Sequence, residues 1–255
     1  MNGIPVAAAL SAMLAAAFPA AAPAAPAAAP RVVASTSWTA AFVRAAGIPE
    51  VRVLAPYEMR HPSDYVVRPS DLLAVRDADV VVYAGYEAMA QRLVEAADGT
   101  RARLVKIDTR NDPATVAASL AVLGDVFGTR QAAAAYAAKV AEFFASWREQ
   151  LRREGLAGAP VIAHTFQRPV AEALGFVVTG EFGPAPLEAA RIVALAKLAP
   201  RLILDTWHNE IGRPLVETMR KTPYVSWLNF PVDPARPGLL DVLGENRARL
   251  TQALR

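Results

Sequence analysis

Residues 61–85 read HPSDYVVRPSDLLAVRDADVVVYAG, and this stretch decides the fold class of the chain. Pro69 favours an extended approach, and Ser70 or Asp71 can cap a helix that follows. The apolar run over 79–83 then predicts a buried strand. A helix that leads into a buried strand is part of a βαβ unit, from which parallel sheets are built.

The same alternation of strand and helix continues on both sides of this stretch. In the first group, strands are predicted at 32–35, 51–54, 79–83 and 104–107, with helices at 38–46, 70–76 and 86–97. In the second group, strands are predicted at 160–163, 176–179, 202–205 and 224–228, with helices at 168–174, 186–198, 212–220 and 239–254. This pattern predicts an α/β protein with two β/α lobes, each with a four-stranded, mainly parallel sheet.

Residues 113–154, between the two groups, have a helical pattern and no strand. A break is expected near Gly128, where Thr129 can cap a new helix. In the second helix the following residues lie at steps of three or four and so share one face: Tyr136, Val140, Phe143, Trp147 and Leu151. About 25 residues at about 1.5 Å each give a helix of roughly 37 Å, long enough to run along both lobes.

We therefore expect an N-terminal lobe at 31–112, a linking helical segment at 113–158 and a C-terminal lobe at 159–255, with the ligand cleft between the lobes. Residues 1–30 are expected to be a secretory signal peptide that is removed, because an apolar run rich in Ala and Leu leads into small residues with several Ala-x-Ala sites. A membrane anchor is the alternative, but the run is shorter than the roughly 20 residues of a spanning helix. We expect a soluble, monomeric protein in the periplasm.

Composition excludes several classes of function. The chain has no Cys, which rules out disulfides, thiolate metal ligands and a cysteine nucleophile. Its net charge of +3 is small and scattered, so nucleic-acid binding is not expected. The sequence has no Gly-rich phosphate loop, no Gly-x-Ser-x-Gly elbow and no His-Glu-x-x-His pair.

The chain has only three histidines, His61, His164 and His208, and each lies just past the carboxyl end of a predicted strand. Ligands of open α/β sheets bind outside these strand ends. A single histidine there is more often a solvated or hydrogen-bonded residue, but three together suit zinc, or less specifically copper or nickel. Zinc would need a fourth ligand, from water or from one of the nearby carboxylates Glu58, Asp64, Asp205, Glu210 and Asp233.

Residues 61–71 and the strand that ends at Gly85 resemble a signature of the substrate-binding proteins of zinc and manganese ABC importers. That family carries a His-Asp-Tyr-x-x-Arg-Pro-Ser-Asp run, followed by a buried strand that ends in Gly. The resemblance implies a periplasmic protein with two β/α lobes and one rigid linking helix. It also implies a metal ion as cargo, a membrane permease as partner, and no enzymatic activity.

The expected ligands depart from the family pattern. Ser63 stands where the family has its first histidine, so His61 would replace it from two positions upstream, whereas His164 matches a later strand-end ligand. No histidine follows the first lobe in 107–113, the family's acidic ligand falls on Asn229, and His208 lies where glutamate is common. A His-rich loop is also missing. We expect a rearranged site of His61, His164 and His208.

Three functions are compatible with these observations. The first is capture of a metal ion, zinc before manganese, copper or nickel, for an ABC importer; its affinity should fall as pH drops through about 6, because imidazole must be neutral to bind a metal. The second is the same fold reused for a metal chelate, an organic ligand or a partner protein. The third is a zinc-dependent hydrolase with Glu58 or Glu210 as general base.

Overall fold

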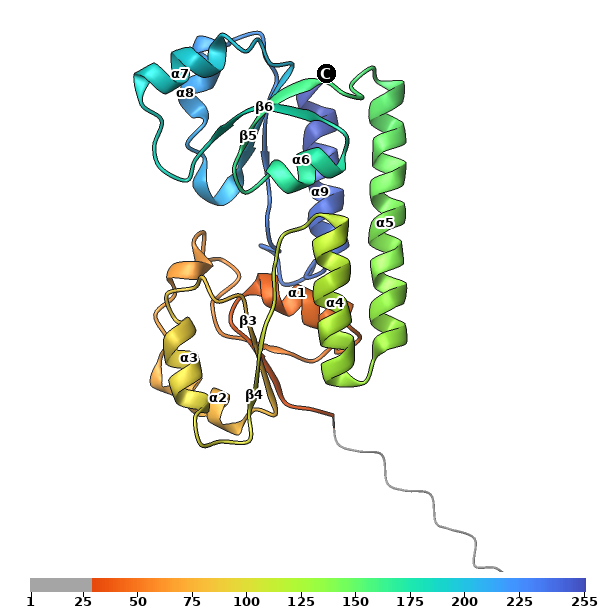
Figure 1. Ribbon diagram of the computed structural model, residues 1–255. Helices are drawn as coiled ribbons and strands as arrows, with labels where there is room; N and C mark the ends of the chain where they lie inside the picture. Colours follow the sequence, from red (N-terminus) through yellow and green to blue (C-terminus); the bar gives the residue numbers. More distant parts are fainter. Residues whose placement is uncertain (1–28) are drawn as a thin grey trace, which may run out of the picture.

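The computed structural model describes residues 29–255 and contains two stacked β/α lobes with helices running along one side of both (Figure 1). All but the last two residues of the expected signal peptide, residues 1–30, lie outside this range. Within the described range, no helix is long and apolar enough to cross a membrane.

Each lobe contains a four-stranded sheet in which every pairing is parallel. The N-terminal sheet has the order β2-β1-β3-β4, with β1 at Val32–Ala34, β2 at Arg52–Val53, β3 at Val80–Tyr83 and β4 at Arg103–Lys106. The C-terminal sheet has the order β6-β5-β7-β8, with β5 at Pro160–His164, β6 at Val177–Phe182, β7 at Leu202–Thr206 and β8 at Tyr224–Trp227. The two lobes thus share one topology, and the expected architecture is confirmed.

Helices connect the strands at the positions that the sequence predicts. The N-terminal lobe has α1 at Ser37–Ala45, α2 at Pro69–Asp77 and α3 at Ala90–Ala97. The C-terminal lobe has α6 at Arg168–Ala173, α7 at Ala189–Ala196, α8 at Arg213–Thr218 and α9 at Leu239–Ala253. The N-cap residue of α2 is Arg68 and not Ser70 or Asp71, but the carboxylate of Asp71, in the first turn, accepts hydrogen bonds from the Arg68 N–H at 2.9 Å and the Tyr65 hydroxyl at 2.8 Å and so stabilises the start of the helix.

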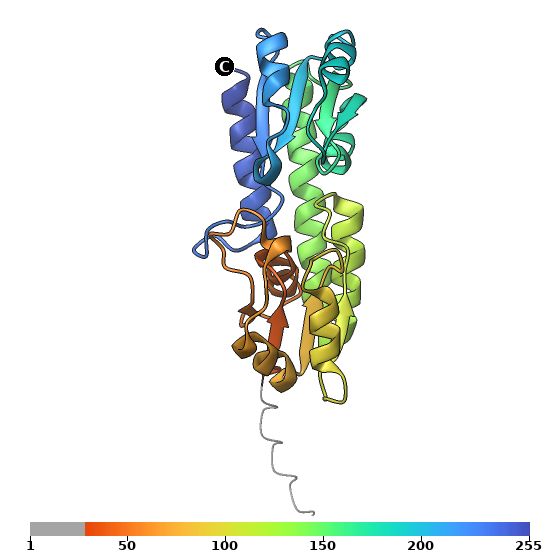
Figure 2. The ribbon, with the colours of Figure 1, turned by 90° about the vertical axis from the view of Figure 1, so that its left-hand side faces the viewer.

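Two antiparallel helices form the link, α4 at Pro113–Phe127 and α5 at Arg130–Arg153. Gly128 ends α4 in the left-handed conformation, with φ at +71°, which glycine adopts without steric cost. Thr129 is the N-cap residue of α5, as predicted, but its hydroxyl donates to the Ala46 carbonyl at 2.5 Å instead of accepting a helix N–H, and so ties the turn to α1. In both views of the molecule, α5 passes beside both lobes (Figures 1 and 2).

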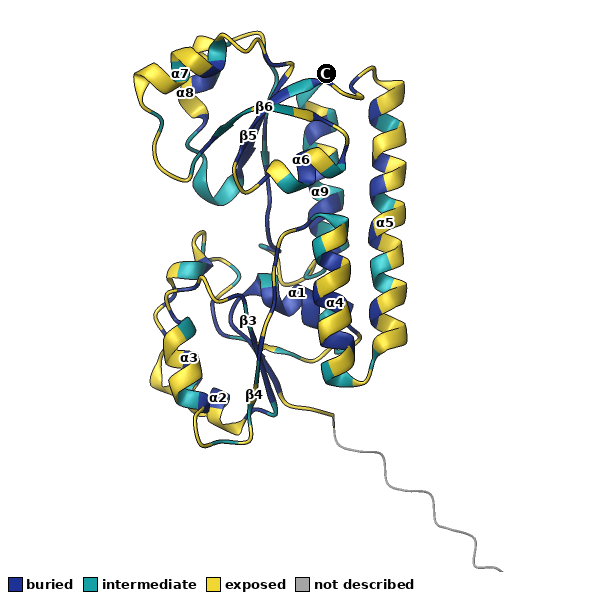
Figure 3. Cartoon of the chain, in the orientation of Figure 1, coloured by how far each residue is buried: buried dark blue, intermediate teal, exposed yellow. Residues whose placement is uncertain are grey.

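One apolar core runs through both lobes along the linking helices. The buried face of α5 contributes Val140, Phe144, Trp147 and Leu151, and Trp147 packs edge-on against Trp227 of β8 with ring centres 5.5 Å apart. The same core extends into the N-terminal lobe through Phe42 of α1, and the buried side of α5 faces the two lobes (Figure 3). The predicted stripe differs in two residues: Tyr136 and Phe143 are only partly buried, and the fully buried phenylalanine is Phe144.

Candidate metal-binding cleft

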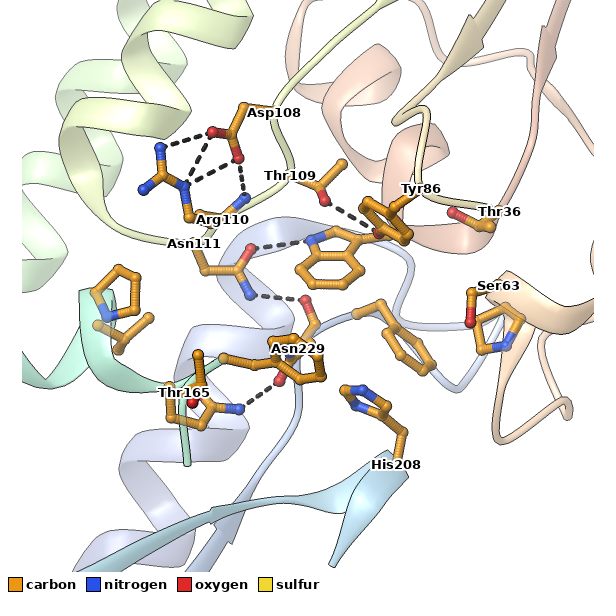
Figure 4. Close-up of a pocket in the computed structure, with 17 residues that line it drawn as sticks. Thr36, Ser63, Tyr86, Asp108, Thr109, Arg110, Asn111, Thr165, His208 and Asn229 are labelled. Carbon is orange, nitrogen blue, oxygen red and sulfur yellow. Dashed lines mark hydrogen bonds and ion pairs between the residues drawn. The ribbon is translucent and has the colours of Figure 1, made fainter. Parts of the chain in front are cut away.

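A cavity of about 560 Å³ lies between the lobes, at the carboxyl ends of both sheets. Figure 4 shows the side chains of the N-terminal lobe and of the following segment, among them Tyr86 and Asn111, on one side and those of the C-terminal lobe, among them His208 and Asn229, on the other. The position follows from the topology. In the N-terminal sheet β2 and β3 lie on opposite sides of β1, and in the C-terminal sheet β6 and β7 lie on opposite sides of β5. Ligands of open α/β sheets bind outside the carboxyl ends of the strands where the strand order reverses in this way.

His164 and His208 follow the two central strands of the C-terminal sheet. His164 is the last residue of β5, and His208 lies in a short turn of helix, Trp207–Asn209, directly after β7. The strands β5 and β7 are adjacent and parallel, so their carboxyl ends lie at the same edge of the sheet. The two histidines therefore lie close together at this edge.

Hydrogen bonds fix the tautomer of His208. The Thr206 hydroxyl donates to Asn229 Oδ1 at 2.7 Å, so at 3.2 Å from His208 Nδ1 it acts as the acceptor. The Nδ1 atom of His208 therefore carries the proton, and the lone pair is on Nε2. No hydrogen bond of this Nε2 is found within residues 29–255, and the ring lines the cavity. A histidine held in this way is prepared to bind a metal.

His61 lies beside His208 from the opposite lobe, with ring centres 6.2 Å apart and the rings nearly perpendicular. The residues next to them hold the two loops together, since Arg60 donates to the Trp207 carbonyl at 2.7 Å and stacks over the Trp207 ring. Two imidazoles that share a tetrahedral zinc at about 2.0 Å have ring centres roughly 5 Å apart. A closure of about 1 Å would therefore let both bind one ion.

His164 is fully buried and does not line the cavity. Its Nδ1 accepts the Phe166 backbone N–H at 3.1 Å, so its proton lies on Nε2, which is buried without a hydrogen-bond partner in the described part of the chain. The Nε2 atom faces Gly183, where φ is +90° and an added Cβ would come within 2.4 Å of this nitrogen. The Phe166 ring packs against the rings of both His164 and His208.

Burial lowers the pKa of both His164 and His208 to about 4, because the imidazolium loses its hydration in the cleft. Both rings are therefore neutral at physiological pH, as a metal ligand must be. For these two residues, protonation competes with a metal only near pH 4. Burial thus moves the competition between proton and metal at His164 and His208 below the value of about pH 6 that the sequence predicts.

None of the five carboxylates that could supply a fourth ligand forms a metal-binding group with the histidines in this arrangement. Asp205 is buried and accepts hydrogen bonds from Thr206, Gly212 and Tyr224. The other carboxylates are occupied or exposed: Glu210 pairs with Arg60 and Arg213, Asp233 accepts the Ala235 N–H, Asp64 accepts the Ser63 hydroxyl, and Glu58 is exposed. Across residues 29–255, no group of three or more His, Cys, Asp or Glu side chains that could hold a metal ion is found.

Asn229 belongs to a buried hydrogen-bond network. Its side-chain oxygen accepts from Gln167 and Thr206, and its backbone carbonyl accepts from Asn111 Nδ2 at 2.6 Å (Figure 4). Asn111 in turn accepts the Trp38 indole N–H at 3.3 Å, so the network joins the two lobes under the cavity.

Sequence reasoning missed Thr206, Phe166 and Trp38, although each lies at or shortly after the carboxyl end of a central strand. The rule that singled out the histidines, a position just beyond the carboxyl end of a strand, applies equally to these residues. None of these three side chains is an expected metal ligand, so a rule restricted to metal ligands does not include the groups that orient and surround them.

Comparisons with known proteins support the fold. No family model matches the chain, and no curated protein matches its sequence. Among solved structures, AdcAII of Streptococcus pneumoniae aligns with a TM-score of 0.68 at 18% identity, over 88% of this chain and 98% of that protein. The SBP FpvC of P. aeruginosa, in complex with Ni²⁺, aligns with a TM-score of 0.68 at 15% identity, over 88% of this chain and 96% of that one.

A third structure is the laminin-binding protein Lmb of Streptococcus agalactiae, described as a bifunctional protein with adhesin and metal transporting activity. It aligns with a TM-score of 0.68 at 14% identity, over 89% of this chain and all of that one. A variant of AdcAII is also known with Zn(II) bound. At these identities the likeness establishes the fold, and the architecture expected from residues 61–85 is confirmed.

Proposed function

We propose that the chain is the solute-binding component of an ABC importer and takes up a transition-metal ion, zinc first, in the cleft between its lobes. His61 and His208 bind the ion directly, and His164 completes the protein ligands. The proposal includes export to the periplasm, removal of the signal peptide within residues 1–30 and delivery by a monomer to a membrane permease. The boundaries of 31–112, 113–158 and 159–255 remain the proposed division into lobes and link.

One observation supports this function most strongly. His208 presents an unprotonated Nε2 to the cavity while Thr206 holds its other nitrogen, and His61 of the opposite lobe lies beside it. Neutral imidazoles suit zinc, nickel and copper better than manganese, which prefers oxygen ligands. The zinc and nickel complexes among the structural neighbours agree with this order of preference.

His164 can join the site only after a local rearrangement. To bind a metal through Nε2, its ring must move the proton to Nδ1, which breaks the hydrogen bond from the Phe166 N–H. We therefore place His61 and His208 first in the order of binding, and His164 after a shift of Phe166. The buried, unpartnered Nε2 favours such a shift, because a metal would satisfy an atom that is otherwise costly to bury.

A zinc-dependent hydrolase is less well supported by the geometry. Its general base would have to lie beside the metal-bound water. Of the two candidates, Glu58 is exposed, and Glu210 lies 3.1 Å from Arg213 and 3.7 Å from Arg60. Neither carboxylate lines the cavity.

Metal analysis of the mature, untagged protein tests the proposal. The stripped protein should take up one zinc per chain in equilibrium dialysis, and His208→Ala should lose it. Glu58→Gln is the matched control, since this exposed carboxylate precedes His61 by three positions, and it should retain full binding. Stoichiometric zinc in His208→Ala, or none in the unaltered protein, would contradict the proposed function.

A further inference from the structure

The cavity is larger than a metal ion requires. Its volume of about 560 Å³ compares with roughly 120 Å³ for four water molecules at about 30 Å³ each. Cavities of about 300 to 1,000 Å³ are typical of sites for organic small molecules. The volume therefore leaves room for a ligand that carries the metal.

Aromatic rings form a continuous arc along this cavity, and His208 is part of it. The successive ring centres of Tyr86, Trp38, Phe230, His208 and Phe166 are 6.2, 5.7, 5.5 and 5.6 Å apart. Tyr86 is 54% exposed and Phe166 42% exposed, and they are the two aromatic residues among the exposed large hydrophobic side chains of residues 29–255. Both line the cavity, one from each lobe. Exposed aromatic surface concentrated at one site is typical of a place where a planar ligand stacks.

The protein offers few donor atoms to a metal at this place. In the observed arrangement His208 and His61 supply two nitrogens, and His164 can be a third ligand only if Phe166 shifts; a chelate stacked on Phe166 would hold that ring in place and keep His164 out of the site. Zinc takes four ligands in proteins, so at least two positions are left for another molecule. A chelator would fill both positions with one ligand.

The charges of the cavity wall and of the metal indicate which kind of chelator would fit. Among residues 29–255, the only charged side chains on the cavity wall are Asp108 and Arg110, and they neutralise each other through hydrogen bonds of 2.7 and 2.9 Å. Two neutral imidazoles leave the double charge of the metal uncompensated, which is unfavourable in a partly desolvated cleft. A chelator with anionic donors would cancel this charge, whereas a highly anionic complex would find no unpaired cation on the wall.

We infer that the cleft takes the metal as a complex with a small, planar, anionic organic chelator, neutral overall, whose ring stacks along the aromatic arc while His208 binds the metal. This inference rests on the proposed function and names the form of its cargo. Two stacking contacts of about 1 kcal/mol each would strengthen binding of such a complex more than tenfold over an aliphatic one of equal charge.

Two zinc chelates of equal charge test the inference. Sulfoxine, a hydroxyquinoline sulfonate, and cysteate, an amino acid sulfonate, both bind zinc as dianions through one nitrogen and one oxygen, and each forms a neutral one-to-one complex, but only sulfoxine is aromatic. Equilibrium dialysis of the stripped mature protein against each complex, against zinc alone and against metal-free sulfoxine gives four affinities. We expect the zinc–sulfoxine complex to bind at least about tenfold tighter than the zinc–cysteate complex.

Two variants test whether the aromatic arc causes the tighter binding of the zinc–sulfoxine complex. Tyr86→Ala should lower the ratio of the two affinities about fivefold, because it removes one wall of the arc. Leu73→Ala, which shortens an equally exposed apolar side chain outside the cavity, should leave the ratio unchanged.

The remaining outcomes separate this inference from the proposed function. Equal affinities for the two chelates, or binding of zinc alone with both chelates excluded, would overturn the inference and leave the function standing. Tight binding of metal-free sulfoxine would overturn it as well, because the metal would then be dispensable. If neither zinc nor its complexes bind, both proposals fail.

Discussion

Thr206 fixes the tautomer of His208, although Thr206 itself is buried and cannot bind a metal. Its hydroxyl has one proton, which goes to Asn229, and this leaves only the role of acceptor toward His208. The imidazole is thereby held with Nδ1 protonated and Nε2 free. A side chain that fixes the tautomer of a ligand contributes to metal affinity without touching the metal.

Removal of this hydroxyl should weaken metal binding. We expect Thr206→Val, which keeps the shape of the side chain, to lower zinc affinity by about tenfold to a hundredfold. Thr165→Val is the control, because the Thr165 hydroxyl also lines the cavity but donates to the Phe182 carbonyl. Competition with a chromogenic chelator measures both; equal affinities in the two variants would show that the tautomer of His208 is irrelevant.

The low pKa values of His164 and His208 predict how stability depends on pH. In the folded protein both lie at about 4, below the ordinary value of 6.5, so the unfolded chain binds more protons as pH falls between these values. Metal-free protein should therefore lose up to about 1.4 kcal/mol of stability per pH unit and per histidine across this window, and the loss should end below about pH 4.

Urea denaturation of the metal-free protein at several pH values between about 6.5 and 4 measures this dependence. The variant His208→Gln removes one of the two groups and should show a shallower loss of stability with falling pH. An identical pH dependence in the two proteins would mean that His208 is protonated as readily in the folded state as in the unfolded chain.

At the scale of elements, the linking helix α5 owes its position to the side chains that it buries. Phe144 is 0% exposed and lies in the core that runs through both lobes, whereas Phe143 is partly buried and lies under the Arg247 guanidinium. The two residues are adjacent and identical in type. They therefore make a matched pair in which only burial differs.

We expect Phe144→Ala to lower the free energy of unfolding by about 3 to 5 kcal/mol, since it leaves a cavity in a packed core. Phe143→Ala should cost less than about 2 kcal/mol. Urea denaturation of each purified variant gives both values. A larger loss in Phe143→Ala than in Phe144→Ala would mean that α5 packs on the face that the sequence pattern predicts, and equal losses would mean that the two rings are buried to the same extent.

The pair also shows how far sequence patterns determine an element. The alternation of strands and helices, the break at Gly128 and three of the buried α5 residues in the predicted stripe follow from the sequence alone. The choice between Phe143 and Phe144 does not, because both are compatible with helical spacing. It is decided by neighbours from distant parts of the chain, such as Trp227, which no local pattern contains.

The candidate site could likewise be predicted from the sequence only in part. The positions of His164 and His208 at strand ends could be predicted, because parallel strands bring their carboxyl ends to one edge. The separation of His164 from the cavity by Phe166 could not, since it depends on which way two neighbouring side chains turn. Nor could the contact of His61 with His208, which depends on how the two lobes are placed relative to each other.

For the whole molecule, the shared core implies that the lobes move little. The core contains buried side chains from both sheets and both linking helices, so a wide opening would expose much of it to water. The 6.2 Å between the ring centres of His61 and His208 needs to shorten by only about 1 Å for both to bind one zinc. A small closure is thus sufficient for the proposed function.

Diffraction from crystals of the zinc-loaded protein, with the anomalous signal of zinc, tests the central claim most directly. The account predicts one strong peak in the cleft at about 2.0 to 2.1 Å from His208 Nε2, with the ring centre of His61 drawn in to roughly 5 Å from that of His208. Zinc found only on surface carboxylates, with His208 free and the two rings still 6.2 Å apart, would contradict it.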